Sequence, residues 1–198
     1  MTCKLGRFTL VLLLAAAVAP SLQAAVWKLD PSHSAAQFAV RHLMVSTVRG
    51  QFEKISGMVN YDPANSEAAS VSIEVDVASI DTRNAKRDDH LRGADFFDVA
   101  NHPVMKFEST RVRKSGDDKL KLTGNLTMRG VTREVTFDVD GPVPPVKVRG
   151  GLRSGATATA TISRKDFAMT WNRALEAGGV TVSDAVHITI DIEMISSE

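Results

Sequence analysis

The chain has 198 residues, of which 43% are hydrophobic and 24% charged, with a formal net charge of +1 at pH 7 and one cysteine. The charges are mixed in sign and spread along the sequence, which argues against nucleic-acid binding because that function normally shows as a concentrated basic face. Cys3 lies in a segment that we expect to be removed, so the mature chain would offer no disulfide, thiolate nucleophile or zinc–cysteine site.

Residues 1–24 have the three-part pattern of a secretory signal peptide. Lys4 and Arg7 give a positive start, an apolar run of twelve residues follows, and Ala24 stands at a suitable cleavage point. The run is shorter than the about 20 residues that cross a bilayer as a helix, so we expect no stable membrane anchor in the mature form, although a retained anchor is the alternative. The pattern predicts an exported, periplasmic protein with one domain over residues 25–198.

Most of the remaining sequence alternates apolar and polar residues with period 2, which is typical of half-buried strands. The alternating segments, in chain order, are "QFAVRH", "GQFEKISGMVNY", "SVSIEVDV", "VMKFESTRV", "KLKLTGNLTM", "REVTFDVD", "ATATATIS" and "VHITIDIEM". Turn signals such as "DPANS", "KSGDD" and "GPVPP" separate them. About eight strands with few helices predict an all-β fold, either an antiparallel barrel or a sandwich.

One helix is predicted over "NAKRDDHLRG", with Asn84 as its N-cap and Gly93 just past its end. A second short helical turn is expected near "SRKDFAMTW". After the first helix, Phe96 and Phe97 are adjacent, and in an extended chain they would point to opposite sides. We expect one of them to enter the barrel and the other to fix the segment to the wall, as in a lid.

Asp88, Asp89 and His90 are the residue types that a metal ion or an acid–base pair uses. Consecutive helical residues point about 100° apart, so these three cannot converge on one ion without further ligands. We therefore favour solvated Asp88 and Asp89 with His90 packing locally. A metal-assisted hydrolase or isomerase that uses Asp89, His90 and His102 is the alternative.

The segment "ATATATIS" places small residues on its apolar face, among them Ala156, Ala158 and Ala160. A wall of small residues either lets a second element pack closely or leaves space inside a barrel. A barrel of about eight strands is wide enough to fill itself with side chains or to hold one ligand.

Four blocks of the sequence resemble the YceI-like family. "WKLDPSHSAAQFAVRHLMVSTVRGQF" is similar to the family's opening pattern W-x-[LI]-D-x-x-H-S…F-x-[VI]-[RK]-H. "DDHLRGADFFDVANHPVMKFES", "LTGNLTMRGVTREVTFDV" and "ISRKDFAMTWNRALEAGGVTVSDAVHITIDIE" resemble its later blocks. The resemblance covers nearly all of residues 26–194 in the same order. It departs at Ala168, where the family commonly has Gly, and in the loop "PVPPVKVRGGLRSG".

The resemblance implies an antiparallel eight-stranded lipocalin-like barrel with one or two short helices. It also implies a tunnel for a long isoprenoid or similar amphiphilic lipid, and no enzymatic activity, catalytic residue, cofactor or metal. A protein of this kind would transport, store or sequester its lipid. The ligand could be a polyisoprenoid, a prenyl diphosphate, or a quinone-like or fatty lipid. A homodimer, or a module that docks another envelope protein through its strand edges, is left open.

We expect six residues to line or border the tunnel: Phe38, Val40, Phe96, Phe107, Phe137 and Trp171. Four residues are expected to supply polar contacts at its mouth: Arg41, His42, His90 and Arg92. A pair such as Arg41 and Arg92 would suit a diphosphate, to which a histidine could donate a further hydrogen bond.

Overall fold

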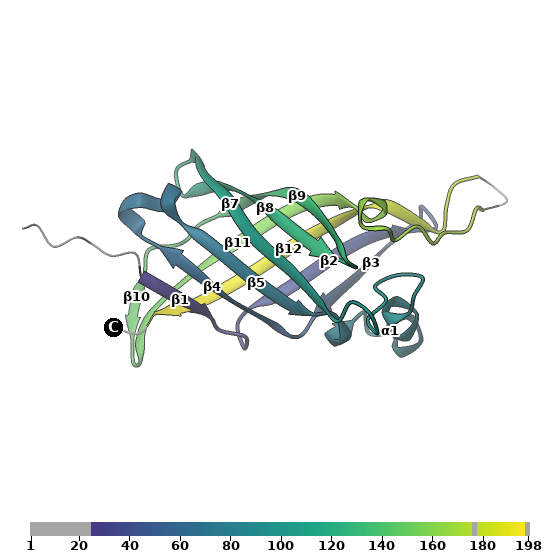
Figure 1. Cartoon of the computed structure of the whole chain (residues 1–198), viewed down its shortest axis with the longest axis horizontal. Coiled ribbons are helices and arrows are strands. Elements are labelled where there is room, and N and C mark those ends of the chain that lie inside the picture. The colour runs from purple at the N-terminus through teal and green to yellow at the C-terminus, as the bar shows by residue number, and fades with distance from the viewer. Residues whose placement is uncertain (1–24, 176–177, 197–198) are drawn as a thin grey trace, which may run out of the picture.

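The computed structural model describes residues 25–175 and 178–196, so the predicted signal peptide lies outside the described residues. The chain forms a single antiparallel sheet that closes into a barrel (Figure 1). The strands are β1 (Ala25–Leu29), β2 (Ala35–His42), β3 (Ser46–Phe52), β4 (Ile55–Tyr61), β5 (Ser70–Asp76), β6 (Ile80–Asp81), β7 (Val104–Gly116), β8 (Lys119–Met128), β9 (Val131–Asp140), β10 (Val146–Val148), β11 (Gly151–Ser163) and β12 (Val182–Ser196). The helical elements are α1 (Ala85–Arg92) and the 3₁₀ turns η1 (Pro63–Ala68), η2 (Val77–Ser79) and η3 (Arg164–Phe167).

Eight strand positions make the wall, because four of these positions each hold two short strands that lie end to end beside the neighbouring position. β1 and β2 share one edge of β12, and they pair with β4 and β3 respectively. Between β1 and β2, the Ser34 hydroxyl donates to the carbonyl of Glu193 at 3.3 Å and accepts from its N–H at 3.1 Å. The serine thus keeps the backbone groups of β12 bonded where the neighbouring strand is interrupted. The predicted eight-stranded antiparallel barrel with few short helices is confirmed.

The pairing of β11 with β12 closes the barrel through a ladder that runs from Leu152↔Ser196 to Ser163↔Ala185. On its other edge β11 pairs with β9 over three residue pairs, from Thr157↔Asp140 to Thr159↔Asp138. The β9–β11 seam is therefore much shorter than the β11–β12 seam.

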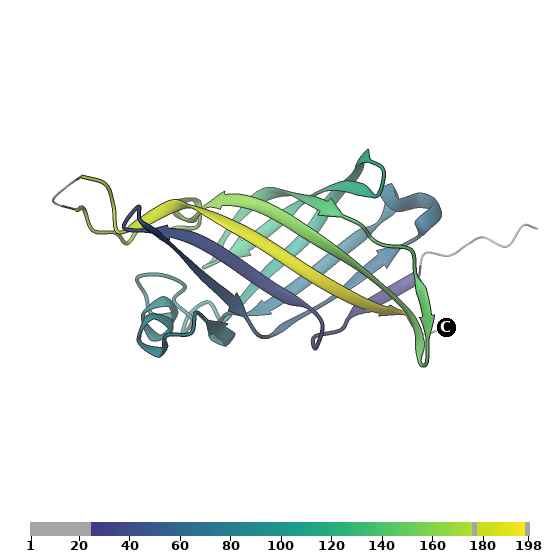
Figure 2. The ribbon, with the colours of Figure 1, turned by 180° about the vertical axis from the view of Figure 1, so that it is seen from behind.

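The two ends of the barrel carry different connections (Figures 1 and 2). The end that we call the α1 end carries the β2–β3 turn, α1, the β8–β9 turn and the segment from η3 to β12. The opposite end, the η1 end, carries η1, the β7–β8 turn and the β9–β11 connection with β10. At the α1 end, the Arg129 guanidinium donates to the carbonyls of Ala168 and Ala94, so it joins the β8–β9 turn to the segments after η3 and α1.

The apolar residues of the period-2 pattern are the residues that face the interior of the barrel. Alternate residues of β5 (Val71, Ile73, Val75) and β12 (Val186, Ile188, Ile190, Ile192, Met194) face inward, together with their counterparts on the other strands. The polar residues between them face outward, since successive side chains of a strand point to opposite faces. The most deeply buried large side chains are Trp27, Val77, Ile80, Phe167 and Met194.

The α1 helix begins and ends where the sequence predicts. The Asn84 side chain accepts a hydrogen bond from the Arg87 N–H at 3.0 Å, which satisfies one of the unpaired donors of the first turn. Gly93 follows the last turn, and its N–H bonds to the carbonyl of His90 at 3.1 Å. The second predicted helical turn is η3, Arg164–Phe167.

The expectation that Asp88 is solvated is wrong. Asp88 is buried, and its carboxylate accepts from both the N–H and the hydroxyl of Thr82, just after β6. Arg87 donates to the same Thr82 through Nε and Nη2, each at 2.7 Å. The carboxylate is therefore an internal cap for the end of β6, and it fastens α1 to the barrel. Asp89 is exposed as expected and forms an ion pair with Arg92 at 3.1 Å.

The substitution Asp88→Ala is expected to lower the free energy of unfolding by about 1–3 kcal/mol, because it leaves the buried N–H and hydroxyl of Thr82 without an acceptor. The matched control Asp89→Ala makes the same change one residue along the helix and removes only an exposed ion pair, so it should shift stability by less than about 0.5 kcal/mol. Urea unfolding of both variants measures the difference. Equal stability of the two variants would contradict the capping role of Asp88.

Candidate ligand-binding cavity

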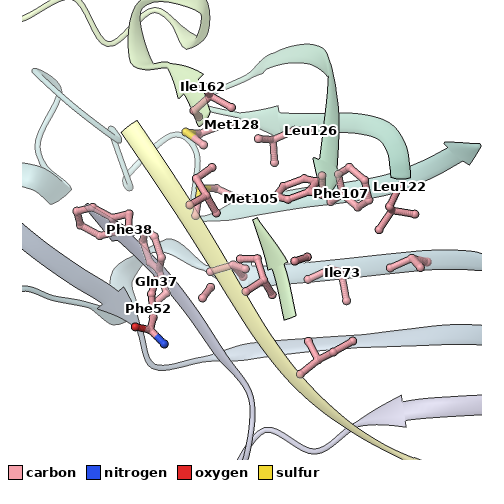
Figure 3. A pocket seen from close by; sticks show the side chains of 18 of the residues that line it. Gln37, Phe38, Phe52, Ile73, Met105, Phe107, Leu122, Leu126, Met128 and Ile162 are labelled. Carbon is pink, nitrogen blue, oxygen red and sulfur yellow. The ribbon is translucent and has the colours of Figure 1, made fainter. Parts of the chain in front are cut away.

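A cavity of about 240 Å³ lies inside the barrel. Every strand position and the segment around α1 contribute to its wall, and Figure 3 shows many of the side chains that meet there. Almost all of the lining is apolar: Ala36, Phe38, Val40, Phe52, Val59, Ala69, Val71, Ile73, Val75, Leu91, Phe96, Phe97, Met105, Phe107, Val112, Leu120, Leu122, Leu126, Met128, Phe137, Val139, Pro142, Ala156, Ala158, Ile162, Met169, Val182, Val186, Ile188, Ile190, Ile192 and Met194.

The small residues of β11 account for part of this space. Ala156 and Ala158 line the cavity, and the register places them opposite Ile192 and Ile190 of β12. Of the two alternatives that the sequence left open for this wall, the structure has the one in which small side chains leave room inside the barrel.

Glycines on two strands make room for phenylalanine rings. A Cβ on Gly124 would lie 2.5 Å from Cζ of Phe107, and one on Gly50 would lie 2.5 Å from Cζ of Phe38. Each distance is far below a normal contact. At Gly124 a Cβ would also lie 2.4 Å from the carbonyl oxygen of Glu108, so the backbone as well as the ring excludes a larger residue there. Gly124 therefore leaves space both for the Phe107 ring of the cavity wall and for the facing backbone of β7.

Five of the six residues predicted to line or border the tunnel line the cavity, and Trp171 lies behind that wall. The five are Phe38, Val40, Phe96, Phe107 and Phe137. Trp171 is half-buried, and its ring packs against Phe96 at 5.3 Å and His90 at 5.1 Å. It therefore borders the cavity through Phe96 and joins the segment after η3 to the segment after α1. A role in holding a ligand stays a prediction for all six.

The expectation that Phe96 and Phe97 take opposite sides of their segment is wrong, because both line the cavity. Residues 94–97 form a turn, whereas the expectation assumed an extended chain. Phe97 packs edge-on against Phe52 of β3 with 5.6 Å between ring centroids, and Phe96 packs against His90 at 5.0 Å. The segment after α1 thus covers the α1 end of the cavity with two aromatic rings.

Four polar residues touch the cavity, and two of them turn their polar groups outward. The amide of Gln37 bonds to Asp191 on the outer face, and Figure 3 shows it pointing away from the apolar side chains. The ammonium group of Lys106 pairs with Glu74, also on the outer face. Among the described residues of the lining, Tyr61 and Arg164 remain as polar residues whose groups lie on the inner side.

Arg164 is buried at the α1 end, and its guanidinium is fully committed to the protein. Nε donates to the carbonyl of Ser183 at 3.0 Å, and Nη1 donates to the carbonyls of Met169 and Trp171 at 2.7 and 2.8 Å. Nη2 donates to the carbonyl of Val182 and to a carboxylate oxygen of Asp184 at 3.2 Å. Burial lowers the pKa of Arg164 from its ordinary value, against the opposing effect of the Asp184 carboxylate. The arginine organises the connection between β11 and β12 and has no donor left for a ligand.

Tyr61 lies at the η1 end of the cavity, where β4 ends. Burial raises the pKa of its phenol, and the nearby carboxylates of Asp118 and Asp62 raise it further, so the phenol is neutral at physiological pH. Within the described part of the chain, its hydroxyl has no hydrogen-bond partner. Sequence reasoning missed both polar residues, although Tyr61 and Arg164 share the inward phase of Val59 and Ile162, and that phase was the available signal.

Two of the residues predicted for a polar mouth lie in or beside the β2–β3 turn and do not line the cavity. Arg41 donates from Nη1 to the Thr47 hydroxyl at 3.1 Å and from Nη2 to the carbonyl of Met44 at 2.9 Å. His42 is half-buried at the end of β2.

The other two predicted mouth residues belong to α1 and also lie outside the cavity lining. His90 contacts the carboxylate of Asp95 at 2.9 Å. Arg92 donates to the carbonyls of Ala78 and Ile80 at 3.0 and 2.9 Å, which fastens α1 to η2 and β6. All four residues belong to the α1 end, but their contacts do not gather them around the cavity, and their role toward a ligand stays a prediction.

The residues of the alternative metal site, Asp89, His90 and His102, are not brought together. Within the described chain, the acidic and histidine side chains whose ligand atoms all lie within 4.8 Å of one another are Asp30, His33 and Glu193.

A cation already occupies that second group. The Arg153 guanidinium contacts the carboxylates of both Asp30, at 2.8 Å, and Glu193. The bond from Arg153, together with the contact of His33 at 3.0 Å, holds the pKa of the Asp30 carboxyl well below its usual range. The cluster is thus an ion-pair network that ties the β1–β2 connection to β11 and β12.

Among residues 25–175 and 178–196, no helix is long and apolar enough to cross a membrane.

Residues 27–194 match the family described as the YceI-like domain. The chain is 39% identical over 142 residues to a UPF0312 protein of Ectopseudomonas mendocina (strain ymp), which covers 70% of this chain and 72% of that protein.

Two solved structures have similar folds. The crystal structure of Burkholderia cenocepacia BcnA is similar with a TM-score of 0.72 and 25% identity, over 83% of this chain and 98% of that one. A polyisoprenoid binding domain from Saccharophagus degradans, implicated in plant cell wall breakdown, is similar with a TM-score of 0.60 over 88% of this chain and 99% of that one. Its sequence identity of 15% supports likeness of fold alone.

The depressed pKa of Asp30 predicts a specific pH dependence of stability. A carboxyl group whose pKa is lower in the folded state stabilises the protein above its unfolded pKa of about 3.9, and this contribution is lost as the pH falls below that value. The variant Asp30→Asn should therefore be less stable than the wild type at pH 7, and its stability should fall less steeply between about pH 5 and pH 2.

Arg153→Gln removes the largest cause of the pKa shift and should reproduce most of this change. Urea unfolding at a series of pH values measures both variants. If the free energy of unfolding of Asp30→Asn falls with pH as steeply as that of the wild type, the network is not the source of the pH dependence.

Proposed function

The chain belongs to the YceI-like family, and on that premise we propose that it is a periplasmic binding protein that holds the chain of a polyisoprenoid or similar amphiphilic lipid inside its barrel. Transport, storage or sequestration of the lipid would follow from such binding. The observation that carries the proposal is the closed barrel with an apolar cavity to which every strand position contributes. The sequence pattern of residues 1–24 supports export to the periplasm.

The chemistry of the cavity wall favours a hydrocarbon chain. Burying each CH₂ group is worth about 0.8 kcal/mol gross, so a few isoprene units would offset the ordering of a flexible chain. The wall offers neither a charged group free to bind nor a row of hydrogen-bonding groups, which a sugar or a peptide would need. The Saccharophagus degradans domain that shares this fold is described as polyisoprenoid binding, so a barrel of this fold is compatible with such a ligand.

The size of the cavity favours a narrow ligand. Its volume of about 240 Å³ is below the roughly 300–1,000 Å³ of typical small-molecule pockets. A long chain therefore requires the interior to widen. Methionine suits this need because it is unbranched and adapts its shape, and Met105, Met128, Met169 and Met194 all line the cavity.

The polar groups of the interior favour a neutral head group. All N–H groups of Arg164 are bonded to the protein, so a diphosphate inside the barrel would meet no free cationic donor. The Tyr61 phenol, by contrast, can donate to a carbonyl or hydroxyl oxygen at the η1 end. We therefore favour a polyprenol or a quinone-like lipid over a prenyl diphosphate. A diphosphate would have to stay outside, near Arg41 or Arg92 of the α1 end.

Purification from the native periplasm without detergent, followed by solvent extraction and mass spectrometry, tests the function directly. We expect a prenyl lipid or a related amphiphile at a stoichiometric level. Protein that is lipid-free after such purification and that binds no added prenyl lipid would overturn the proposal.

Filling part of the cavity is expected to weaken ligand binding. Ala158→Leu adds an inward side chain, and it should weaken the binding of geranylgeraniol by about tenfold or more, which corresponds to roughly 1.4 kcal/mol of lost burial. Thr159→Leu is the matched control, because it adds a similar side chain to the outer face of the same strand. Displacement of a fluorescent apolar probe measures both affinities, and thermal unfolding checks that both variants fold. Equal weakening by the two variants would contradict an interior site.

Removal of the Tyr61 hydroxyl is expected to lower the affinity only for ligands that carry a polar head group. Tyr61→Phe should lower the affinity for geranylgeraniol by about two- to tenfold, the worth of one neutral hydrogen bond. The affinity for squalene, which has no polar atom, should stay within about twofold and serves as the control. Equal losses for both ligands would show that Tyr61 acts through packing.

A further inference from the structure

Three consecutive large apolar residues project into solvent at the α1 end. Leu43, Met44 and Val45 of the β2–β3 turn are 40%, 54% and 80% exposed. Isolated apolar residues are common on protein surfaces, but contiguous ones indicate a binding surface. We call these three residues the apolar tip.

The backbone of the tip is held in a conformation that its residues disfavour. Leu43 and Met44 have φ angles of 51° and 60°, in the left-handed region where Asn and Gly are the usual residues of a hairpin turn. The Arg41 guanidinium donates to the carbonyl of Met44 at 2.9 Å, and the Leu43 N–H bonds to the carbonyl of Thr181 at 2.8 Å. Since neither folding nor turn chemistry calls for bulky apolar residues here, their presence points to a contact made by their side chains.

Basic side chains stand beside the tip. Arg41 precedes it on β2, and the exposed Arg173 lies on the neighbouring segment, where its carbonyl accepts from the Thr181 N–H at 2.9 Å. Both views of the ribbon show the β2–β3 turn at the same end of the barrel as this segment, beside the part of the segment that lies nearest the barrel (Figures 1 and 2). Among the ion pairs of the described residues, none involves Arg41 or Arg173, and the nearby Asp184 pairs with Arg164 and Lys165.

We propose that the apolar tip docks the protein on an anionic lipid bilayer. The three side chains enter the boundary between head groups and acyl chains, and Arg41 and Arg173 face lipid phosphates. Apolar side chains beside basic ones are the combination that binds such a surface reversibly. Three side chains cover far less than the about 1,000 Å² that a specific protein interface needs, so a bilayer suits the tip better than a partner protein.

This inference rests on the proposed function, and it concerns the step in which the lipid passes between the bilayer and the barrel. Val40 of β2 and Val182 of β12 line the cavity, and each lies within a few residues of the docking segments. Docking by the tip would hold the α1 end of the cavity against the bilayer, where an amphiphilic chain leaves or enters the lipid phase.

Two other exposed apolar surfaces provide matched controls. Met58 on the outer face of β4 is 51% exposed, close to the value for Met44. Val146 of β10 is 59% exposed at the opposite end of the barrel, beside Val148. Changing each of them to serine removes an exposed side chain of the same type as one at the tip, namely a methionine and a valine.

Co-sedimentation with large vesicles of phosphatidylethanolamine and phosphatidylglycerol tests the proposal. Wild-type protein should bind these vesicles, and it should bind less at high salt and less to vesicles of phosphatidylcholine alone. Met44→Ser combined with Val45→Ser should reduce the bound fraction by about fivefold or more. Met58→Ser and Val146→Ser should leave it unchanged, and Arg173→Gln should reduce the binding and its salt dependence.

Two further measurements separate the tip from the fold and from lipid binding in the barrel. The double serine variant should bind geranylgeraniol in solution as the wild type does, since the tip does not line the cavity. A tryptophan introduced by Val45→Trp should shift its emission to the blue on mixing with vesicles, whereas one introduced by Val146→Trp should not.

The proposal is overturned if wild-type protein does not sediment with anionic vesicles, if the double serine variant binds them as well as the wild type, or if Val146→Ser has the larger effect. The proposed function survives each of these results as long as the barrel binds prenyl lipid in solution.

Discussion

The pairing of β11 with β12 is the interaction on which the rest of the structure depends. It joins the last strands of the chain into a ladder along nearly their whole length and so closes the sheet. Closure turns the inward half of every alternating strand into a single enclosed surface, which an open sheet would leave exposed. The alanines of β11 leave an apolar cavity only because the barrel is closed, since a gap on an open sheet would fill with water.

The closed interior also decides how polar groups are used. A buried guanidinium has to find acceptors, and Arg164 finds them in the carbonyls of the β11–β12 connection rather than in a ligand. Its charge therefore shapes the α1 end without adding charge recognition to the cavity. What remains for recognition is the shape of the apolar wall and the Tyr61 hydroxyl.

The sequence predicted the helices and strands that form because of interactions between near neighbours in the chain. Period-2 alternation marked the strands, and Asn84 and Gly93 marked the ends of α1, because pleat and capping depend on near neighbours in the chain. Inward-facing residues such as Phe107 followed from the same alternation. The errors concern residues whose surroundings come from outside their own helix or strand. Asp88 is buried because the chain just before α1 folds back so that Thr82, after the end of β6, bonds to its carboxylate.

The residues predicted for the polar mouth show the same limit of sequence-based prediction. Arg41 and Arg92 belong to the same end of the barrel, but one holds a turn and the other holds a helix, and neither task is visible in the spacing of the sequence. Phe97 joined the cavity because the chain after α1 turns, whereas a period-2 argument assumes extension. The local pattern thus identifies which residues are inside, and the connections between strands decide what happens at the two openings.

Because the β9–β11 seam is short, the wall of the barrel can open more easily there than between β11 and β12. Only three residue pairs join these strands, against the long ladder on the other edge of β11. A barrel that expands around a guest yields most readily where few backbone hydrogen bonds join neighbouring strands, so this seam is one of its compliant lines, with β10 adding three more pairs on the same edge of β11. Amide protons along the seam should accordingly exchange with solvent sooner than those between β11 and β12. Ala158 of β11 lies within this seam, opposite Val139 of β9, so the compliant line includes one of the small residues that leave room for the guest.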